Sequence, residues 1–428
     1  GDKVDVNGNV TKSNILKPFN DALSRLPGGA KVNVLSASLT WQVLAKLDSN
    51  NQLSEIYMSK VPYHSFAYDN DKSLVNFTNN LDNIYEIARQ ESAEKVIFNK
   101  LNSLGNGEGH ILAQAFDQMR GHIYGGVQQR IKSTSDILGG EISSLRSERN
   151  VSKDSNKFKA FGQRNEFKTD TAGIIDYTSN AYGVAYVHED ETVKLGHSSG
   201  WYAGAVHNRF KFKDIGNSKE NQTMLKAGVF KTISPSGDHN GNLRWTISGD
   251  VFAGINEMNR RFLVVDDIFQ AKANYYSYGA ALKNELGYDI RMSERTHLKP
   301  YGMLKMEYGR FTGIKEKSGE MRLEVEGNDY FSVKPEVGLE FKYIQPLAVR
   351  TQLSVGITAA YENELGKVGD VNNRARVRYT TADWFGIRGE KDDRRGNGKF
   401  DLNIGIDNTR VGFTLNAGYD TKGQNIRG

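Results

Sequence analysis

The strongest constraint in this sequence is a two-residue alternation of apolar and polar side chains that recurs from about residue 157 to residue 428. In "FSVKPEVGLEFKY", residues 331–343, the odd positions are apolar and the even positions are polar or charged. A β-strand sends successive side chains to opposite faces, so one face of this strand is apolar and the other is charged. Either the apolar face forms a soluble core, or it faces lipid while the charged face lines a lumen.

The placement of charges and rings favours the second arrangement. Charged residues occupy the middle of the polar faces, at Lys283, Glu285, Lys305, Glu307, Glu336 and Glu340. Apolar faces end in aromatic residues, as at Tyr276, Tyr288, Tyr308, Phe331, Tyr343, Tyr361 and Tyr419. Aromatic rings at both ends of a strand suit the two interfaces of a membrane. The pattern predicts an all-β transmembrane barrel of twelve antiparallel strands, the last beginning near Ile426.

The connections between the predicted strands alternate in length. Those at 234–242, 291–297, 344–348 and 407–410 are short, whereas those at 256–273, 312–329 and 362–399 are long. Short periplasmic turns and long external loops are typical of outer-membrane barrels, and a soluble sandwich has no reason for this segregation. We expect residues 363–398 to lie outside the cell without an apolar core, with Trp384 and Phe385 able to fold back over the pore mouth.

Composition excludes several classes of protein. The mean hydropathy is −0.57, and no stretch has the roughly 18 consecutive apolar residues of a membrane helix. Cysteine is absent, and a net charge of +5 on 428 residues gives no reason to expect nucleic-acid binding. We predict no enzyme activity, no catalytic residues, no cofactor and no metal. "GHSSG" at 196–200 lacks the strand–turn–helix context of a serine nucleophile. The loop that begins at Asp393 has Ile404 at the position where a calcium-binding loop needs Glu. His188 has no second histidine at helical spacing with which to bind a metal ion.

Three segments precede the predicted barrel. Residues 1–70 are β-rich, residues 71–126 form a helical segment, and residues 127–156 contain a helix that is polar on nearly every side. Such a helix is poor in isolation, but a charged lumen would suit it. We expect it to traverse the pore. Its candidate residues are Arg130, Glu141, Arg146, Glu148 and Arg149, facing lumen positions Lys283, Glu285, Glu307, Glu336, Glu340 and Arg350. Arg146 and Arg149 are the candidates for pairing with a lumen carboxylate. The rival interpretation is a solvated linker outside the barrel.

Several stretches resemble classical autotransporters, the monomeric branch of type V secretion. "AFDQMRGHIYGGVQQR" is similar to the family's helical segment, and "AYGVAYVHED" to its second strand, with Tyr182 and Gly183. "LKPYGMLKMEYG" is similar to a characteristic strand in which Lys299 replaces the usual acid, and "VGFTLNAGYDTKGQNIRG" to the final hairpin. The resemblance covers residues 157–428, about two thirds of the chain, and is closest to large outer-membrane adhesins of the fusobacterial type.

This resemblance implies a translocator in the bacterial outer membrane that secretes and anchors its own N-terminal passenger, an adhesin, at the cell surface. It implies as partners the outer-membrane lipid and lipopolysaccharide, the barrel-assembly machinery, the passenger polypeptide and a host surface receptor. Residues 1–70 would be the C-terminal end of the passenger. Family members end in a strand that closes with an aromatic residue, whereas this sequence stops at Gly428. The sequence alone therefore leaves the pairing of the first and last strands open.

Two other classes remain at this point. An outer-membrane channel or porin with a plug leaves the long helical segment before the barrel unexplained. A soluble β-rich binding domain leaves the segregated loop lengths unexplained.

Overall fold

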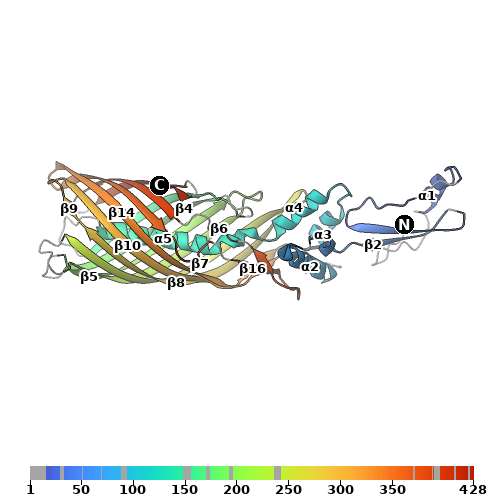
Figure 1. Cartoon of the computed structure of the whole chain (residues 1–428), viewed down its shortest axis with the longest axis horizontal. Helices are drawn as coiled ribbons and strands as arrows, with labels where there is room; N and C mark the ends of the chain where they lie inside the picture. The colour runs from blue at the N-terminus through green and yellow to red at the C-terminus, as the bar shows by residue number, and fades with distance from the viewer. Residues whose placement is uncertain are drawn as a thin grey trace.

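The computed structural model describes residues 16–28, 33–50, 52–68, 70–87, 94–147, 156–169, 174–191, 196–235, 242–369, 372–387, 389, 396–408, 411–422 and 425–428. The molecule is elongated, with a barrel at one end, helices beside its mouth and a two-stranded hairpin beyond them (Figure 1). The elements before the barrel are α1 (Leu16–Leu23), β1 (Trp41–Leu47), β2 (Leu53–Lys60), η1 (Tyr63–Phe66), α2 (Lys72–Ile87), α3 (Glu94–Asn102), α4 (Gly109–Met119), η2 (His122–Gly126) and α5 (Val127–Ser147).

Twelve antiparallel strands close into a barrel, as the alternation predicts. They are β3 (Asn156–Phe167), β4 (Tyr177–Glu191), β5 (Ser198–Phe212), β6 (Lys219–Ile233), β7 (Leu243–Val264), β8 (Asp267–Tyr288), β10 (Thr296–Phe311), β14 (Asn328–Ala348), β15 (Thr351–Asn363), β18 (Gly396–Asp407), β19 (Gly412–Asp420) and β20 (Asn425–Arg427). Each strand pairs with the next, and the circuit closes through a short pairing of β20 with β3.

The pairing of the first and last strands, which the sequence leaves open, is present. Arg427 of β20 pairs with Asn165 of β3. The Gly428 N–H donates to the Arg164 carbonyl at 2.8 Å, and the Arg164 N–H donates in return at 2.5 Å. Because β20 is three residues long, this seam has fewer hydrogen bonds than the β3–β4 pair, which extends from Asn156 to Phe167.

The apolar faces point away from the lumen and are exposed. Aliphatic side chains such as Val251, Leu282, Leu339, Ile357 and Ile404 form a band around the middle of the barrel. Exposed rings flank it at Tyr182, Tyr276, Tyr308, Phe331 and Tyr361 on one side, and at Phe158, Trp201, Trp245, Tyr288 and Phe413 on the other. On β8, twelve residues separate Tyr276 from Tyr288. At about 3.3 Å per residue and a tilt of about 40°, the rings lie about 30 Å apart and enclose an apolar band of about 25 Å.

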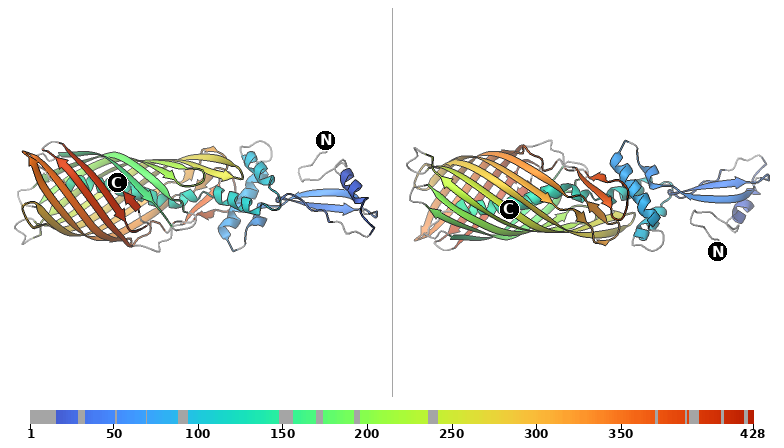
Figure 2. Two further views of the ribbon diagram at one scale, coloured as in Figure 1. Left: turned by 90° about the horizontal axis from the view of Figure 1, so that it is seen from above. Right: turned by 90° about the horizontal axis from the view of Figure 1, so that it is seen from below.

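The two ends of the barrel differ. The turns β4–β5, β6–β7, β8–β10, β14–β15 and β18–β19 meet at one end, here called the turn end. The connections β5–β6, β7–β8, β10–β14 and β15–β18 meet at the other, here called the loop end, beside α2, α3 and α4 (Figures 1 and 2). The short strands β9 (Ile290–Arg291), β11 (Ile314–Lys315), β12 (Ser318–Gly319), β13 (Leu323–Val325), β16 (Asn373–Val377) and β17 (Phe385–Ile387) lie within these connections.

The structure differs from the expectation for all three of the predicted long loops. Residues 256–273 are not a loop, because β7 and β8 continue through them as a hairpin that turns at 265–266. The connections after β10 and β15 are also not structureless, since β11, β13, β16 and β17 pair in a four-stranded sheet. The connection at 363–398 contributes to an apolar core, contrary to the expectation. Phe385 is fully buried, with its ring 5.2 Å from that of Phe77 in α2.

The helices of residues 71–126 share that core with the loop end of the barrel. Asn80 of α2 is fully buried and binds the loop strands through both ends of its amide. Its Nδ2 donates to the Asp383 carbonyl at 2.8 Å, and its Oδ1 accepts from the Val377 N–H at 3.0 Å and the Thr380 hydroxyl at 3.1 Å. Burying an amide is favourable when its donors and acceptors are paired in this way. The helices therefore cap the loop end rather than lie apart from it.

From this cap the chain turns into the barrel. Gly121 has a φ of +73°, and a Cβ there would lie 2.6 Å from Cδ1 of Leu323. Glycine is therefore required where α4 ends and η2 leads into α5. Helix α5 has 21 residues and a length of about 32 Å, and it extends through the lumen toward the turn end (Figure 1). Among the described residues, no helix has the length and apolar character needed to span a bilayer.

Candidate functional site

Helix α5 is enclosed by the strands, and this explains why so polar a helix is stable. Its buried residues include Gln128, Arg130, Lys132, Thr134 and Ser135 together with Ile131 and Leu138. Leu138 approaches β5 closely, since a Cβ on Gly204 would lie 2.7 Å from Leu138 Cδ1. Polar side chains can be buried on several faces of one helix only if the surrounding wall supplies partners. The lumen supplies them at three levels.

Near the loop end, Arg130 forms a buried ion pair with Glu220 of β6. The Arg130 Nε–Glu220 Oε1 distance is 2.8 Å, and the two side chains are 2% and 0% exposed. The Tyr275 hydroxyl donates to the other Glu220 oxygen at 2.6 Å, and Gln222 donates to Oε1 at 2.9 Å. Arg130 also donates to the Ile123 carbonyl at 2.8 Å. Both members of this buried pair therefore have further hydrogen-bond partners, as a buried pair requires. The Arg130 Nη2 atom is buried without a partner among the described residues.

In the middle of the lumen, charges on the helix alternate with charges on β10. Asp136 lies 2.5 Å from both Lys132 and Lys305. Ser135 donates to Glu307 at 2.8 Å, and Lys132 lies 3.6 Å from the same carboxylate. These contacts fix both the rotation and the depth of the helix, because each helix charge meets a specific strand position.

Toward the turn end the ion pairs continue on two sides of the helix. Glu141 lies 2.8 Å from Lys159 of β3, and Arg146 lies 3.8 Å from Glu285 of β8. Lys283 donates to the Ser143 hydroxyl at 3.2 Å. The first and last turns of α5 are therefore both held to the barrel wall.

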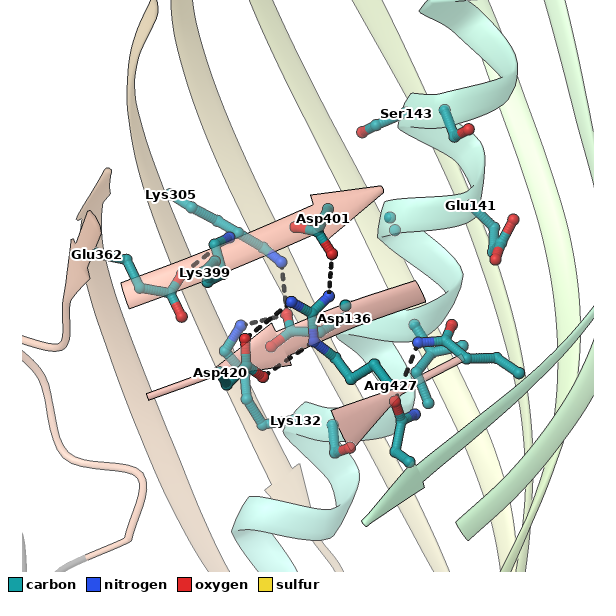
Figure 3. A pocket seen from close by; sticks show the side chains of 18 of the residues that line it. Lys132, Asp136, Glu141, Ser143, Lys305, Glu362, Lys399, Asp401, Asp420 and Arg427 are labelled. Carbon is teal, nitrogen blue, oxygen red and sulfur yellow. Dashed lines mark hydrogen bonds and ion pairs between the residues drawn. The ribbon is translucent and has the colours of Figure 1, made fainter. Parts of the chain in front are cut away.

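The helix does not fill the lumen. A cavity of about 780 Å³ lies between α5 and the barrel wall. Most of its wall comes from β14, β15, β18, β19, β20 and β3, and one or two residues from each of β4, β5, β6, β7, β8 and β10 also line it. Its lining is charged, and Figure 3 shows Lys305 meeting Asp136, and Arg427 meeting Asp401 and Asp420. Lys399 pairs with Glu336 and lies 3.3 Å from Glu362. A lumen of this kind suits water and polar chain segments, not apolar ligands.

Most of the residues named from the sequence lie around this helix. Arg130, Glu141 and Arg146 project from α5 to the wall, and Lys283, Glu285, Glu307 and Glu336 line the lumen. Glu340 is half-buried on the same face of β14 as Glu336. Arg350 is a correction: it lies exposed in the β14–β15 turn with a φ of 61°, because the strand ends at Ala348. Glu148 and Arg149 lie outside the described residues.

The sequence reasoning missed the partners that lie in the extended hairpin and in the cap. Arg260 of β7 forms a buried ion pair with Glu316, at 2.8 Å, and Tyr124 donates to the same carboxylate at 2.8 Å. Burial, followed by the Glu316 charge, raises the pKa of the Tyr124 hydroxyl well above its usual value. The missed signal was the alternation at Met258, Arg260, Phe262 and Val264, which continues past the expected end of the strand. Within the described residues, no group of three or more histidines or carboxylates is placed to hold a metal ion.

A closed twelve-stranded barrel with an apolar belt, two aromatic girdles and a charged lumen occupied by a helix is a transmembrane protein of the outer-membrane class. The sequence matches the family described as autotransporter beta-domain over residues 156–419, more than half of the chain. The chain therefore belongs to the autotransporter β-domain family and is an outer-membrane translocator.

Three solved autotransporter structures are similar to this chain, and the first of them shows the same fold. The translocator domain of the autotransporter NalP from Neisseria meningitidis is similar with a TM-score of 0.50 and 13% identity, covering 70% of this chain and 94% of that one. The β-domain of the Bordetella autotransporter BrkA matches with a TM-score of 0.42 and 11% identity, over 63% and 96% of the two chains. The transport unit of AIDA-I from Escherichia coli matches with a TM-score of 0.40 and 11% identity, over 69% and 95%. No curated protein matches the sequence.

Proposed function

We propose that this translocator exports the polypeptide that includes residues 1–70 and then retains it at the cell surface, with the loop end outside and the turn end in the periplasm. The observation that carries the proposal is the path of the chain. Helix α5 links elements at the loop end to β3, whose first residues lie near the last turn of the helix, where Lys157 donates to the Arg146 carbonyl at 3.2 Å. The chain therefore passes once through the lumen, and the described residues before α5 lie on the loop side.

The ion pairs of α5 support a tether that stays in the pore after export. A porin with a plug is the second candidate, but it has no need of a cap that packs on the loop end and continues into the β1–β2 hairpin. Backbone hydrogen bonds join the chain just before that hairpin to the cap, from the Leu39 N–H to the Leu104 carbonyl at 2.9 Å and from the Asn106 N–H to the Ala37 carbonyl at 3.0 Å.

The same proposal includes the partners that the family resemblance implies. Insertion would use the barrel-assembly machinery, the barrel wall would contact lipopolysaccharide, and the passenger would be an adhesin that binds a host surface receptor. We also propose that the chain itself has no enzyme activity. The paired state of the lumen residues supports this, since Lys132, Asp136 and Glu307 all have partners on the opposing element.

A peptide tag fused before Gly1 tests the function and the orientation together. Antibody should label the tag on intact cells, and added protease should remove it. A second tag in the β14–β15 turn, at Val349, is the matched control and should be reached only after permeabilisation. Exposure of the Val349 tag and protection of the N-terminal tag would invert the topology. Protection of both tags on intact cells would favour the porin, because it would show that no passenger reaches the cell surface.

A further inference from the structure

Five basic side chains lie together on the outer wall of the barrel near the loop end. They are Arg209 and Lys211 on β5, Lys219 on β6, Arg261 on β7 and Lys272 on β8, here called the cationic row. Their sequence neighbours Phe210, Glu220 and Ala271 are fully buried and face inward. Because side chains alternate along a strand, the five cations face outward.

The strand register brings these cations close to one another. Lys211 is directly opposite Lys219, Lys219 is opposite Asn259, and Asn259 is opposite Lys272. Directly opposite residues have their Cβ atoms about 4.5–5.5 Å apart, and two like charges in that position destabilise the sheet. Arg261 and Arg209 flank this line, opposite Gln270 and Asn221.

Little within the protein neutralises this charge. No ion pair joins any of the five cations to another described residue. Two carboxylates lie on these rows. Glu257 of β7 has Asn221 and Asn274 as its cross-strand neighbours, and Glu320 follows β12 beside Gln270; neither forms an ion pair with the five cations in the described part of the chain. An arrangement that costs stability within the chain points to a binding partner of opposite charge.

The row lies at the level of lipid headgroups. On β8, Lys272 is four residues beyond Tyr276, a ring of the loop-end girdle. On β5, Lys211 is four residues beyond His207, which is paired with the girdle residue Tyr182. At about 3.3 Å per residue and a tilt of about 40°, the lysines lie about 10 Å beyond the girdle, in the polar region outside the hydrocarbon. A soluble partner approaching from outside would meet the cap first, so the adjacent membrane lipid is the occupant that the position favours.

We propose that the cationic row is a binding site for the phosphate groups of the outer-leaflet lipid that surrounds the barrel. The proposal rests on the orientation given above, with the loop end outside. The two arginines present planar guanidinium groups that bind phosphate bidentately, and the three lysines supply point charges. The row spans four neighbouring strands, so one phosphorylated headgroup can contact several cations at once. The site would keep outer-leaflet lipid bound to the part of the barrel wall formed by β5–β8.

The test uses the full chain purified in a zwitterionic detergent and titrated with lipopolysaccharide. The variant Lys211→Gln/Lys219→Gln should bind about 25-fold more weakly, from about 1 kcal/mol for each basic residue near an anionic lipid surface. The matched control is Lys231→Gln/Arg291→Gln, which removes two exposed cations from the turn end and should leave binding unchanged. Wild-type binding should weaken with added salt.

Two further arms identify the ligand group. The same lipopolysaccharide after enzymatic dephosphorylation should bind wild type as weakly as intact lipid binds the Lys211→Gln/Lys219→Gln variant, and millimolar inorganic phosphate should not displace the intact lipid. The proposed site would be refuted if Lys231→Gln/Arg291→Gln lost as much lipopolysaccharide affinity as Lys211→Gln/Lys219→Gln, or if the wild type bound dephosphorylated lipopolysaccharide tightly. Full displacement by inorganic phosphate would replace a lipid site by a free-anion site. None of these outcomes depends on the orientation in cells, which the tag experiment measures separately.

Discussion

The buried ion pair between Arg130 and Glu220 allows a direct test of whether the barrel wall keeps helix α5 in the lumen. We consider Glu220→Met, which keeps the length of the side chain and removes its charge. In the wild type, Glu220 is fully buried and accepts hydrogen bonds from Arg130, Tyr275 and Gln222. The variant leaves the Arg130 guanidinium buried 4.9 Å from the Phe212 ring centroid, with the Ile123 carbonyl as its remaining acceptor among these contacts.

Removing one partner of a buried ion pair costs about 3–5 kcal/mol, because an uncompensated charge remains in a site that excludes water. If that cost falls on the docked helix, the fraction of barrels with a displaced helix rises by roughly two to four orders of magnitude. Replacing both partners by apolar side chains is much less costly, since no buried charge is left. Arg130→Met/Glu220→Met should therefore lie closer to wild type than Glu220→Met does.

The assay is single-channel conductance of the purified chain in planar bilayers. Glu220→Met should show frequent open events, and the double variant should show fewer. Glu257→Met is the matched control, because it removes a carboxylate from the outward face of β7 at the same end of the barrel. Heat-dependent mobility on gels would establish that each variant still forms a barrel. Equal closure of Glu220→Met and wild type, with intact barrels, would refute the view that this pair holds the helix.

Three further outcomes are expected from the same structure. Leu282→Arg places a charge on the exposed apolar belt and should lower the free energy of unfolding by about 2–4 kcal/mol near the midplane of the bilayer, whereas Ser354→Arg on the lumen face should lower it less. Urea unfolding in lipid vesicles measures both free energies, and equal losses would contradict the lipid-facing assignment. The pair Ser143→Cys/Ala281→Cys, at two positions lining one cavity, should react with a short thiol crosslinker, whereas Ser143→Cys with cysteine at the outward Leu282 should not. Burial lowers the pKa of Lys60 to about 8, so the unfolded state binds more protons between pH 8 and pH 10 and the hairpin–cap contact should become more stable as the pH rises through that window. Denaturation followed by tryptophan fluorescence should show this rise, and Lys60→Met should remove it.

The sequence by itself predicts the number of strands, the side of each strand that faces lipid and the presence of a helix before the barrel. The lipid-facing and lumen-facing sides are predictable because side chains alternate along each strand, so the pattern is present within every short stretch of sequence. Leu282 and Lys283 are neighbours that point to different solvents, and no distant contact is needed to distinguish them. The polar helix is recognisable for a related reason, since its composition fits neither lipid nor free solution.

Only the tertiary structure decides which charges meet and where the wall ends. Glu220 is paired with Arg130 and Tyr275 because the register of β6, β7 and β8 brings them to one level of the lumen, and register is a non-local property. The alternation of β15, extended backward through the turn, predicts that Arg350 faces the lumen, whereas Arg350 lies exposed in the turn itself. The packing of the cap on the loop end is also not predictable from local sequence. Asn80 and residues 377–383, which bind one another, are about 300 positions apart, and neither segment alone indicates that it contacts the other. Local periodicity fixes which way a side chain points, whereas its partner is fixed by the path of the whole chain.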